Sequence, residues 1–272
     1  MIDFDTPPAI PLWKVAARRP TFAGSIPRVE ARAARLAGDP AAYSRVCGFP
    51  VADTLPVTFP DVLARGLQLA VLSAPAFPVP ALGILHVRQR IEQRRPLRAG
   101  EALAGRVWVE GHRVVRKGGE FDMHTVVSAG GEDVWHGVTT ILSKAIPGDG
   151  EKRPHPQPAS FLRRRSVCWR LPPDQGRRYA AVSGDANPIH LWGITARLFG
   201  FRRPIAHGWW ALARALAEMD TDVPGACVVE ARFASPLPLP GSCTFESGPA
   251  ADGHRFEIRG RDTCVEGRVI DT

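Results

Sequence analysis

Two side chains with complementary acid–base chemistry, Asp185 and His190, stand close together in a segment rich in turn-forming residues. Asp185 precedes Asn187-Pro188, and a proline keeps the residue before it out of the helical region. The chain must therefore bend between the carboxylate and the imidazole, which lets both reach one bound water. Such a pair can add water to an activated double bond, because it takes a proton from the water and supplies one to the carbon alpha to the carbonyl.

A helix start follows this pair at His207-Gly208. Apolar residues at positions 209, 212, 213 and 216 predict an amphipathic helix over Trp209–Met219. The first N–H groups of a helix have no intrahelical acceptor and lie at the positive end of its dipole. They suit the stabilisation of negative charge on a reacting carbonyl oxygen, and Gly208 allows a ligand to approach that backbone closely.

Residues 179–208 resemble the MaoC-like, hydratase-2 family of hot-dog proteins. The family motif has the form Y-x-x-x-S-G-D-x-N-P-I-H, followed by A-x-x-x-G-F-x-x-x-I-A-H-G. This sequence matches the first part at Tyr179, Ser183, Gly184, Asp185, Asn187, Pro188, Ile189 and His190. It matches the second part at Ala196, Gly200, Phe201, Ile205, Ala206, His207 and Gly208.

The resemblance implies an α+β double hot-dog fold, in which each repeat wraps an antiparallel sheet around a central helix. It implies reversible syn hydration of trans-2-enoyl thioesters to (3R)-3-hydroxyacyl thioesters, carried by CoA or acyl carrier protein, in fatty-acid metabolism. Asp185 and His190 would activate the water, and the Gly208 N–H would bind the oxyanion. Ser183 and Asn187 would support the loop. The family pattern requires no cofactor.

Two departures from the family pattern stand out. Many members carry an acidic or amide residue two positions after the histidine, where this chain has Trp192, and this leaves the acyl-chain preference open. The other departure is in an internal repeat: Tyr43–Gly48 matches Tyr179–Gly184, but Phe49 stands where Asp185 would be. We therefore expect one active site per chain. The resemblance to double hot-dog members of the family implies that the first repeat has lost catalysis and helps to house the acyl chain.

The segment Pro147–Pro158, rich in Pro, Gly and charge, divides the chain into similar halves. We predict a degenerate N-terminal hot-dog repeat over residues 1–146, a linker over 147–158 and a catalytic C-terminal domain over 159–272. Val62–Leu72 is the predicted central helix of the first half. The predicted strands are Leu103–Glu110, Phe121–Ser128, Val134–Leu142, Ala226–Ala234, Cys243–Ser247, His254–Arg259 and Cys264–Ile270.

Several residues near the motif keep two interpretations. His207 would support the site or only pack against the helix, and Trp209 would face the sheet or line an acyl tunnel, as would Trp210. Arg202 and Arg203 would bind substrate phosphates or lie in a solvated loop. Trp108, Trp135 and Trp169 fall in strand patterns and are expected in the core, whereas His86, His112, His124, His136, His155 and His254 lack metal-ligand spacing and are expected to be structural or on the surface.

The composition is that of a globular protein, with a formal net charge of +8 and no cluster typical of a nucleic-acid reader. We therefore expect no nucleic-acid partner. The five cysteines form no CxxC pair and are expected to be free thiols, so we expect a cytoplasmic protein. Met1–Pro11 lacks the basic start of a signal peptide. Gly66–Val87 is uncharged, but its three prolines would break a membrane-spanning helix, so a helix end and a Pro-rich loop are expected there.

Three functional alternatives stay open on the sequence alone. A dehydratase or hydratase is the leading hypothesis. A non-catalytic subunit that binds acyl thioesters and a thioesterase are the others, because fold alone does not determine function. Assembly into a homodimer is also open, since two repeats in one chain can form a complete pseudo-dimer.

Overall fold

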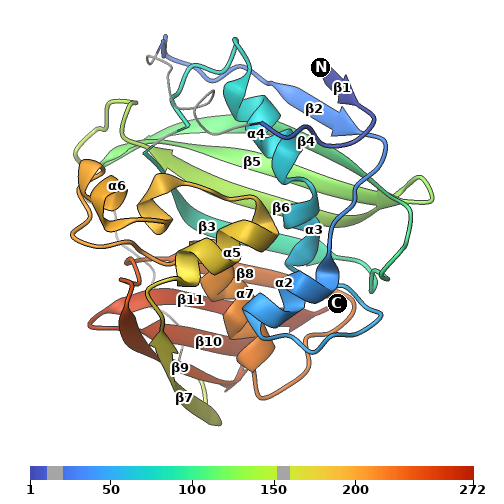
Figure 1. The fold of residues 1–272 in the computed structure, drawn as a ribbon, viewed down its shortest axis with the longest axis vertical. Helices are drawn as coiled ribbons and strands as arrows, with labels where there is room; N and C mark the ends of the chain where they lie inside the picture. The colour runs from blue at the N-terminus through green and yellow to red at the C-terminus, as the bar shows by residue number, and fades with distance from the viewer. Residues whose placement is uncertain (11–20, 82, 152–159) are drawn as a thin grey trace. The chain divides into compact units, whose positions relative to one another are not determined.

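The computed structural model describes residues 1–10, 21–81, 83–151 and 160–272, which form two compact units (Figure 1). Unit 1 comprises Met1–Gly38, Pro60–Gln89 and Gly100–Gln157, and unit 2 comprises Asp39–Phe59, Arg90–Ala99 and Pro158–Thr272. Unit 2 thus takes two segments from the sequence that precedes the predicted linker. Of that linker, residues 147–151 are described, and residues 152–158 lie outside the described residues, as does His155.

Unit 1 is built on a meander of three long antiparallel strands, β4 (Leu103–Val115), β5 (Gly118–Ala129) and β6 (Glu132–Ser143). The short β2 (Glu30–Ala33) pairs antiparallel with β4, and β1 (Ile2–Phe4) pairs parallel with β2. All three predicted strands of this half are confirmed, and each is longer than expected. Buried and half-buried positions alternate over residues 103–107 of β4, as in a sheet with one face on the core.

The predicted helix Val62–Leu72 is wrong as one continuous element. The structure has α3 (Phe59–Leu63) and α4 (Arg65–Ser73), interrupted at Ala64. A glycine lies just past the interruption, and glycine weakens a helix interior. Gly66 has a packing reason: a Cβ there would lie 2.5 Å from the Pro8 carbonyl oxygen, so only glycine lets the N-terminal segment pass so close. The helix α4 packs against β2 and β4.

Unit 2 has a five-stranded antiparallel sheet in the order β8–β11–β10–β9–β7. Its strands are β7 (Arg165–Leu171), β8 (Cys227–Phe233), β9 (Gly241–Ala250), β10 (Gly253–Arg259) and β11 (Thr263–Asp271). Its helices are α2 (Pro40–Cys47), α5 (Gln175–Ser183), the short 3₁₀ helix η1 (Pro188–His190), α6 (Gly193–Leu198) and α7 (Gly208–Glu218). The four strands and the helix predicted for this half are confirmed.

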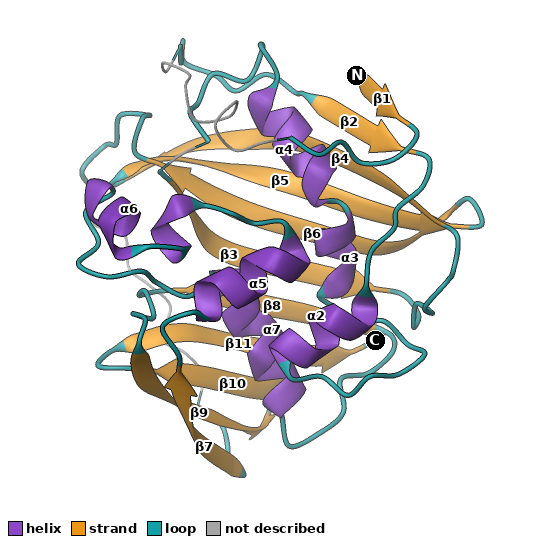
Figure 2. Ribbon diagram, in the orientation of Figure 1, coloured by secondary structure: helices purple, strands orange, loops and turns teal. Residues whose placement is uncertain are grey.

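The central helix α7 lies against β10 and β11 (Figure 2). Three alanines, Ala211, Ala213 and Ala215, are fully buried, as is Leu212 between them. Small side chains let the helix axis approach the sheet, and burial of the apolar face supplies most of a helix's stability in a protein. This packing fixes where α7 begins, and with it the position of Gly208.

The internal repeat seen in the sequence corresponds to two similar helices, both in unit 2. Each ends at a glycine in the left-handed conformation, Gly48 at φ 84° after α2 and Gly184 at φ 70° after α5. The buried rings of Tyr43 and Tyr179 contact each other, with centroids 6.2 Å apart. The matching letters therefore mark the same local structure, a helix with a glycine C-cap.

One long strand, β3 (Ile84–Gln93), was missed by the sequence analysis. Its first residues belong to unit 1 and its last four to unit 2. Six of its ten residues are polar or charged, so it lacks the apolar alternation that marked the other strands. It also corrects the expectation of a loop up to Val87, because the strand begins at Ile84. None of the described helices has the length and apolar character needed to cross a membrane.

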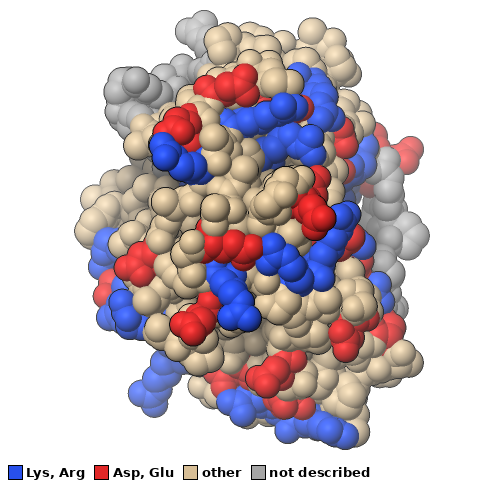
Figure 3. Space-filling view, turned by 90° about the vertical axis from the view of Figure 1, so that its right-hand side faces the viewer, with Lys and Arg blue, Asp and Glu red and all other residues tan. Residues whose placement is uncertain are grey.

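The expectations for tryptophans and cysteines are confirmed. Trp108, Trp135 and Trp169 lie in β4, β6 and β7 and are buried. All five cysteines are free, and only Cys168 is exposed. Basic and acidic side chains lie next to one another on the face seen in Figure 3, so the excess positive charge does not gather there.

Candidate active site

The loop after α5 fixes Asp185 through a chain of local hydrogen bonds. Ser183 is buried, and its hydroxyl donates to the Tyr179 carbonyl (2.8 Å) and accepts from the Asp185 N–H (3.2 Å). The Asn187 N–H donates to Asp185 Oδ1 (3.2 Å), and Asn187 Oδ1 accepts from the Ile189 N–H (3.4 Å). One carboxylate oxygen is thus held by the backbone of its own turn, in the manner typical of Asp in turns.

His190 ends η1 and is buried, with a relative exposure of 9 %. Its Nδ1 lies 2.7 Å from the Ile205 carbonyl oxygen, which can only accept, so Nδ1 carries the proton. In the neutral ring, Nε2 therefore has the lone pair of a base. Burial lowers the pKa of His190, and the nearby negative charge of Asp185 opposes this shift only in part. The imidazole is thus kept neutral, with the Nε2 lone pair available to accept a proton.

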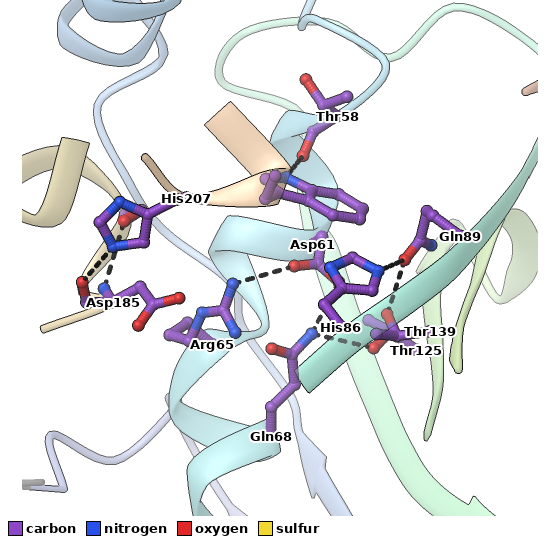
Figure 4. Close-up of polar contacts among 12 residues, drawn as sticks. Thr58, Asp61, Arg65, Gln68, His86, Gln89, Thr125, Thr139, Asp185 and His207 are labelled. Atoms are coloured by element: carbon purple, nitrogen blue, oxygen red, sulfur yellow. Dashed lines mark hydrogen bonds and ion pairs between the residues drawn. The ribbon is translucent and has the colours of Figure 1, made fainter. Parts of the chain in front are cut away.

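His207 links the two candidate catalytic residues. Its Nε2 donates to the Asp185 backbone carbonyl (2.9 Å), a contact visible in Figure 4. Its ring stacks on the His190 ring, with centroids 3.7 Å apart, and also contacts Tyr179 at 4.8 Å. His207 precedes α7, but its side chain makes no capping hydrogen bond to the helix.

Gly208 is the first residue of α7, where backbone N–H groups have no intrahelical acceptor. A Cβ at this position would lie 2.9 Å from the Phe233 ring of β8. A larger residue would therefore push the helix start away from the sheet. The glycine keeps the first turn of α7 in place, at the end of the segment that carries Asp185 and His190.

A further positioning residue, Gly176 in α5, was missed by the sequence analysis. A Cβ there would lie 1.9 Å from the His190 carbonyl oxygen, so the helix backbone and the histidine backbone are in direct contact. Its neighbour Arg177 donates to the Leu191 carbonyl (3.1 Å). The glycine lies outside the motif, and only its contact across the fold reveals its role.

The two tryptophans that follow Gly208 are both buried and both anchored by their indole N–H groups. Trp209 donates to the Thr58 carbonyl (3.2 Å), and Trp210 donates to the Val46 carbonyl (3.1 Å). Tyr43 donates to the Thr58 hydroxyl (2.9 Å). The start of α7 is therefore tied to the segment Asp39–Phe59 of the same unit (Figure 4).

Arg202 and Arg203 are both exposed. Arg203 donates to the Pro240 carbonyl (3.1 Å). Both interpretations of this pair, a phosphate contact and a solvated loop, agree with exposure.

Unit 1 holds a buried polar cluster of its own. The Gln68 amide donates to Asp61 Oδ1 (2.7 Å) and to the Thr125 hydroxyl (3.1 Å), and Arg65 pairs with Asp61 Oδ2 (3.3 Å; Figure 4). Asp61 is a carboxylate that is only 2 % exposed, and such a group must be paired to be stable in the interior. Among the described residues, no group of His, Cys, Asp and Glu is arranged to hold a metal ion.

Comparison with known proteins identifies the family of the chain. The family model of the MaoC-like domain matches residues 150–247. The chain is 37 % identical over 220 residues to a Mycobacterium tuberculosis protein named 3-hydroxyacyl-thioester dehydratase X, covering 80 % of this chain and 79 % of that protein. The crystal structure of HtdX from the same organism superposes with a TM-score of 0.77 at 32 % identity, covering 90 % of this chain and all of that one.

The fold has a further match in another Mycobacterium tuberculosis protein, described as having a double hot-dog fold. It superposes with a TM-score of 0.54 at 14 % identity over 87 % of this chain and 86 % of that one. With a central helix on an antiparallel sheet and an Asp–His loop at the start of that helix, the chain is a double hot-dog protein. It belongs to the MaoC-like dehydratase family.

Proposed function

We propose that the protein catalyses reversible hydration of trans-2-enoyl thioesters, and dehydration of (3R)-3-hydroxyacyl thioesters, at a site formed by Asp185, His190 and Gly208. The observation that carries this is the tautomer of His190. Its Nδ1 proton is committed to the Ile205 carbonyl, which makes Nε2 the base, in the same unit as a carboxylate and a helix start. The name of the dehydratase relative supports the same reaction.

The reaction needs one water and no net proton. In the hydration direction, His190 Nε2 takes a proton from a water that the Asp185 carboxylate orients, and the hydroxide oxygen bonds to C3. The C2=C3 electron pair moves toward the thioester carbonyl, whose oxygen becomes negative. The N–H of Gly208 would stabilise that oxygen. The proton then passes to C2 on the same face, and the base returns to its starting state.

We assign the remaining residues of the motif to support. Ser183, Asn187 and His207 would hold the Asp185 loop, and Trp209 would hold the start of α7. This assigns one active site to each chain, within residues 159–272, and the substrate is an acyl thioester of CoA or of an acyl carrier protein. The free thiols fit a reducing compartment, and we propose the cytoplasm.

The test is turnover of trans-2-butenoyl-CoA by the purified protein, followed as loss of the conjugated enoyl absorbance, with chiral analysis of the product. Formation of the (3R)-hydroxy product is expected. Release of free CoA thiol without hydration would instead identify a thioesterase. Binding without either product, across a series of chain lengths, would identify a non-catalytic acyl-binding protein.

A further inference from the structure

The surface around α6 exposes apolar side chains that a folded protein normally buries. Among the described residues, seven large apolar side chains are exposed, and three of them are Trp192 (55 %), Ile194 (78 %) and Leu198 (78 %). Ile194 and Leu198 are four positions apart on α6, so they share one face of the helix. We call Trp192, Ile194, Arg197 and Leu198 the α6 patch.

Exposed arginines lie close in sequence to these apolar side chains. Residues 186–217 contain no Asp or Glu, and Arg197, Arg202 and Arg203 in this stretch are exposed. Within the described part of the chain, no ion pair is recorded for these three arginines, in contrast to residues such as Arg113 and Arg268. An exposed apolar centre with an unneutralised cationic rim is complementary to an acidic surface that has an apolar centre.

The α6 patch is joined directly to the candidate active site. The Thr195 hydroxyl, on α6, donates to the Pro188 carbonyl (2.7 Å) and to the Trp192 carbonyl (2.9 Å). Pro188 begins η1, which ends at His190. Arg177 of α5 holds the other side of this turn, with its guanidinium 4.4 Å from the Trp192 ring centroid. A partner on the α6 patch is thus one helix away from the catalytic histidine.

We propose that the α6 patch docks an acidic carrier protein that presents the acyl thioester, an inference that rests on the proposed function and names the form of its substrate. The nucleotide part of CoA is anionic but has no aliphatic surface, so it would leave Ile194 and Leu198 in water. A membrane is disfavoured, because a six-residue helix with two aliphatic side chains buries little apolar area in a bilayer. A small, charged contact fits a carrier that must dissociate after each turnover.

The first test compares three forms of the trans-2-butenoyl thioester: on an acyl carrier protein of net negative charge, on CoA, and on pantetheine. We expect kcat/KM for the carrier form to exceed that for pantetheine by about tenfold or more, and the advantage to shrink at high salt. The double variant Ile194→Asp/Leu198→Asp should remove the advantage through a higher KM. Its rates with CoA and pantetheine should not change.

The matched control is Leu162→Asp, which makes the same change at another exposed leucine of unit 2 (64 % exposed). For the charge, Arg197→Glu is compared with Arg164→Glu, an exposed arginine in the same unit. Both controls should behave as the wild type. Equal losses with all three substrates, or a carrier form that is no better than pantetheine, would overturn the proposal.

A binding measurement separates this proposal from the proposed function. Titration of the unacylated carrier protein into the ¹⁵N-labelled wild type should give saturable binding that the double variant loses, whether or not any thioester is hydrated. Binding retained by the double variant would refute docking at the α6 patch. Two other results would also refute it. If the double variant loses binding to anionic vesicles but still binds the carrier, the patch binds a membrane. If the double variant is a monomer where the wild type is a dimer, the patch binds a second copy of the chain.

Discussion

The imidazole rings of His190 and His207 stack with their centroids 3.7 Å apart, and each ring donates one hydrogen bond to a backbone carbonyl. His190 donates to Ile205, and His207 donates to Asp185. The two histidines therefore have different tasks. The first is the base that we propose, whereas the second contacts both the ring of the first and the turn that carries the Asp185 carboxylate.

Removal of either side chain of the proposed catalytic pair should abolish most of the activity. His190→Asn retains an amide that can donate to the Ile205 carbonyl but has no base, and Asp185→Asn removes the charge at constant size. Each should lower kcat by about 10²–10⁴-fold, the usual range for acid–base catalysis. Steady-state hydration of trans-2-butenoyl-CoA gives the rates. Asp174→Asn, at a carboxylate paired with Arg178 outside the site, serves as the control, and full activity of Asp185→Asn would contradict the mechanism.

The pH profile should show the lowered pKa of His190. Because burial favours the neutral ring, kcat/KM should stay high as the pH falls through 6.5, the ordinary value for histidine, and decline only below it. The charge of Asp185 raises this pKa, so Asp185→Asn should move the His190 titration to still lower pH, measured by NMR of the ring protons. An acid limb at or above 6.5 would rule out His190 as the base.

The same shift predicts a pH dependence of stability. The unfolded chain binds the His190 proton more tightly than the folded one, because the folded pKa is the lower of the two. The contribution of His190 to the free energy of unfolding therefore decreases as the pH falls from 6.5 to its folded pKa, and is constant below that. Urea unfolding of the wild type and of His190→Asn across this range should differ in slope; parallel curves would contradict the assignment.

His207→Phe should separate stacking from hydrogen bonding. The phenyl ring can still stack on His190, but the donor to the Asp185 carbonyl is lost. One buried hydrogen bond is worth about 1 kcal/mol, so we expect a fall in kcat of roughly tenfold, smaller than for His190→Asn. An equal loss in the two variants would mean that His207 itself takes part in proton transfer.

The close contact of α5 with His190 predicts a strong effect from a single methyl group. Gly176→Ala would place a Cβ 1.9 Å from the His190 carbonyl oxygen, so the backbone of η1 must move. We expect a fall in kcat, because positioning errors of about 1 Å can cost about 10²-fold. The control is Gly193→Ala on α6, where a Cβ would meet nothing within 4 Å. Similar behaviour of both variants would remove Gly176 from the positioning residues.

The local features of the site could be predicted from sequence, and the tertiary ones could not. The order Gly184-Asp185-Ala186-Asn187-Pro188 specifies a turn by its residue types, and the structure has the Asx contacts expected of it. The tautomer of His190 depends on Ile205, which meets it only through the fold. The contact at Gly176 has the same origin, since nothing in its own neighbours distinguishes it from a glycine in a solvated turn.

The same division holds for the secondary structure. Strands with one apolar face, such as β10 and β11, can be predicted from the alternation of apolar and polar residues alone. The strand β3 carries too few apolar residues to be recognised, and the interruption at Ala64 reflects packing of the N-terminal segment against Gly66. The assignment of Asp39–Phe59 to unit 2 was equally inaccessible, because it rests on contacts such as that between Trp209 and Thr58.

The membership of Asp39–Phe59 in unit 2 has a consequence for any C-terminal fragment of the protein. A fragment encoding residues 159–272 alone keeps every motif letter but loses the carbonyl oxygens of Val46 and Thr58, to which Trp210 and Trp209 donate. The N–H groups of both indoles would then lack these acceptors at the start of α7. The segment Asp39–Phe59 is thus part of the same folded unit as residues 159–272, and we expect that unit to need it in order to fold.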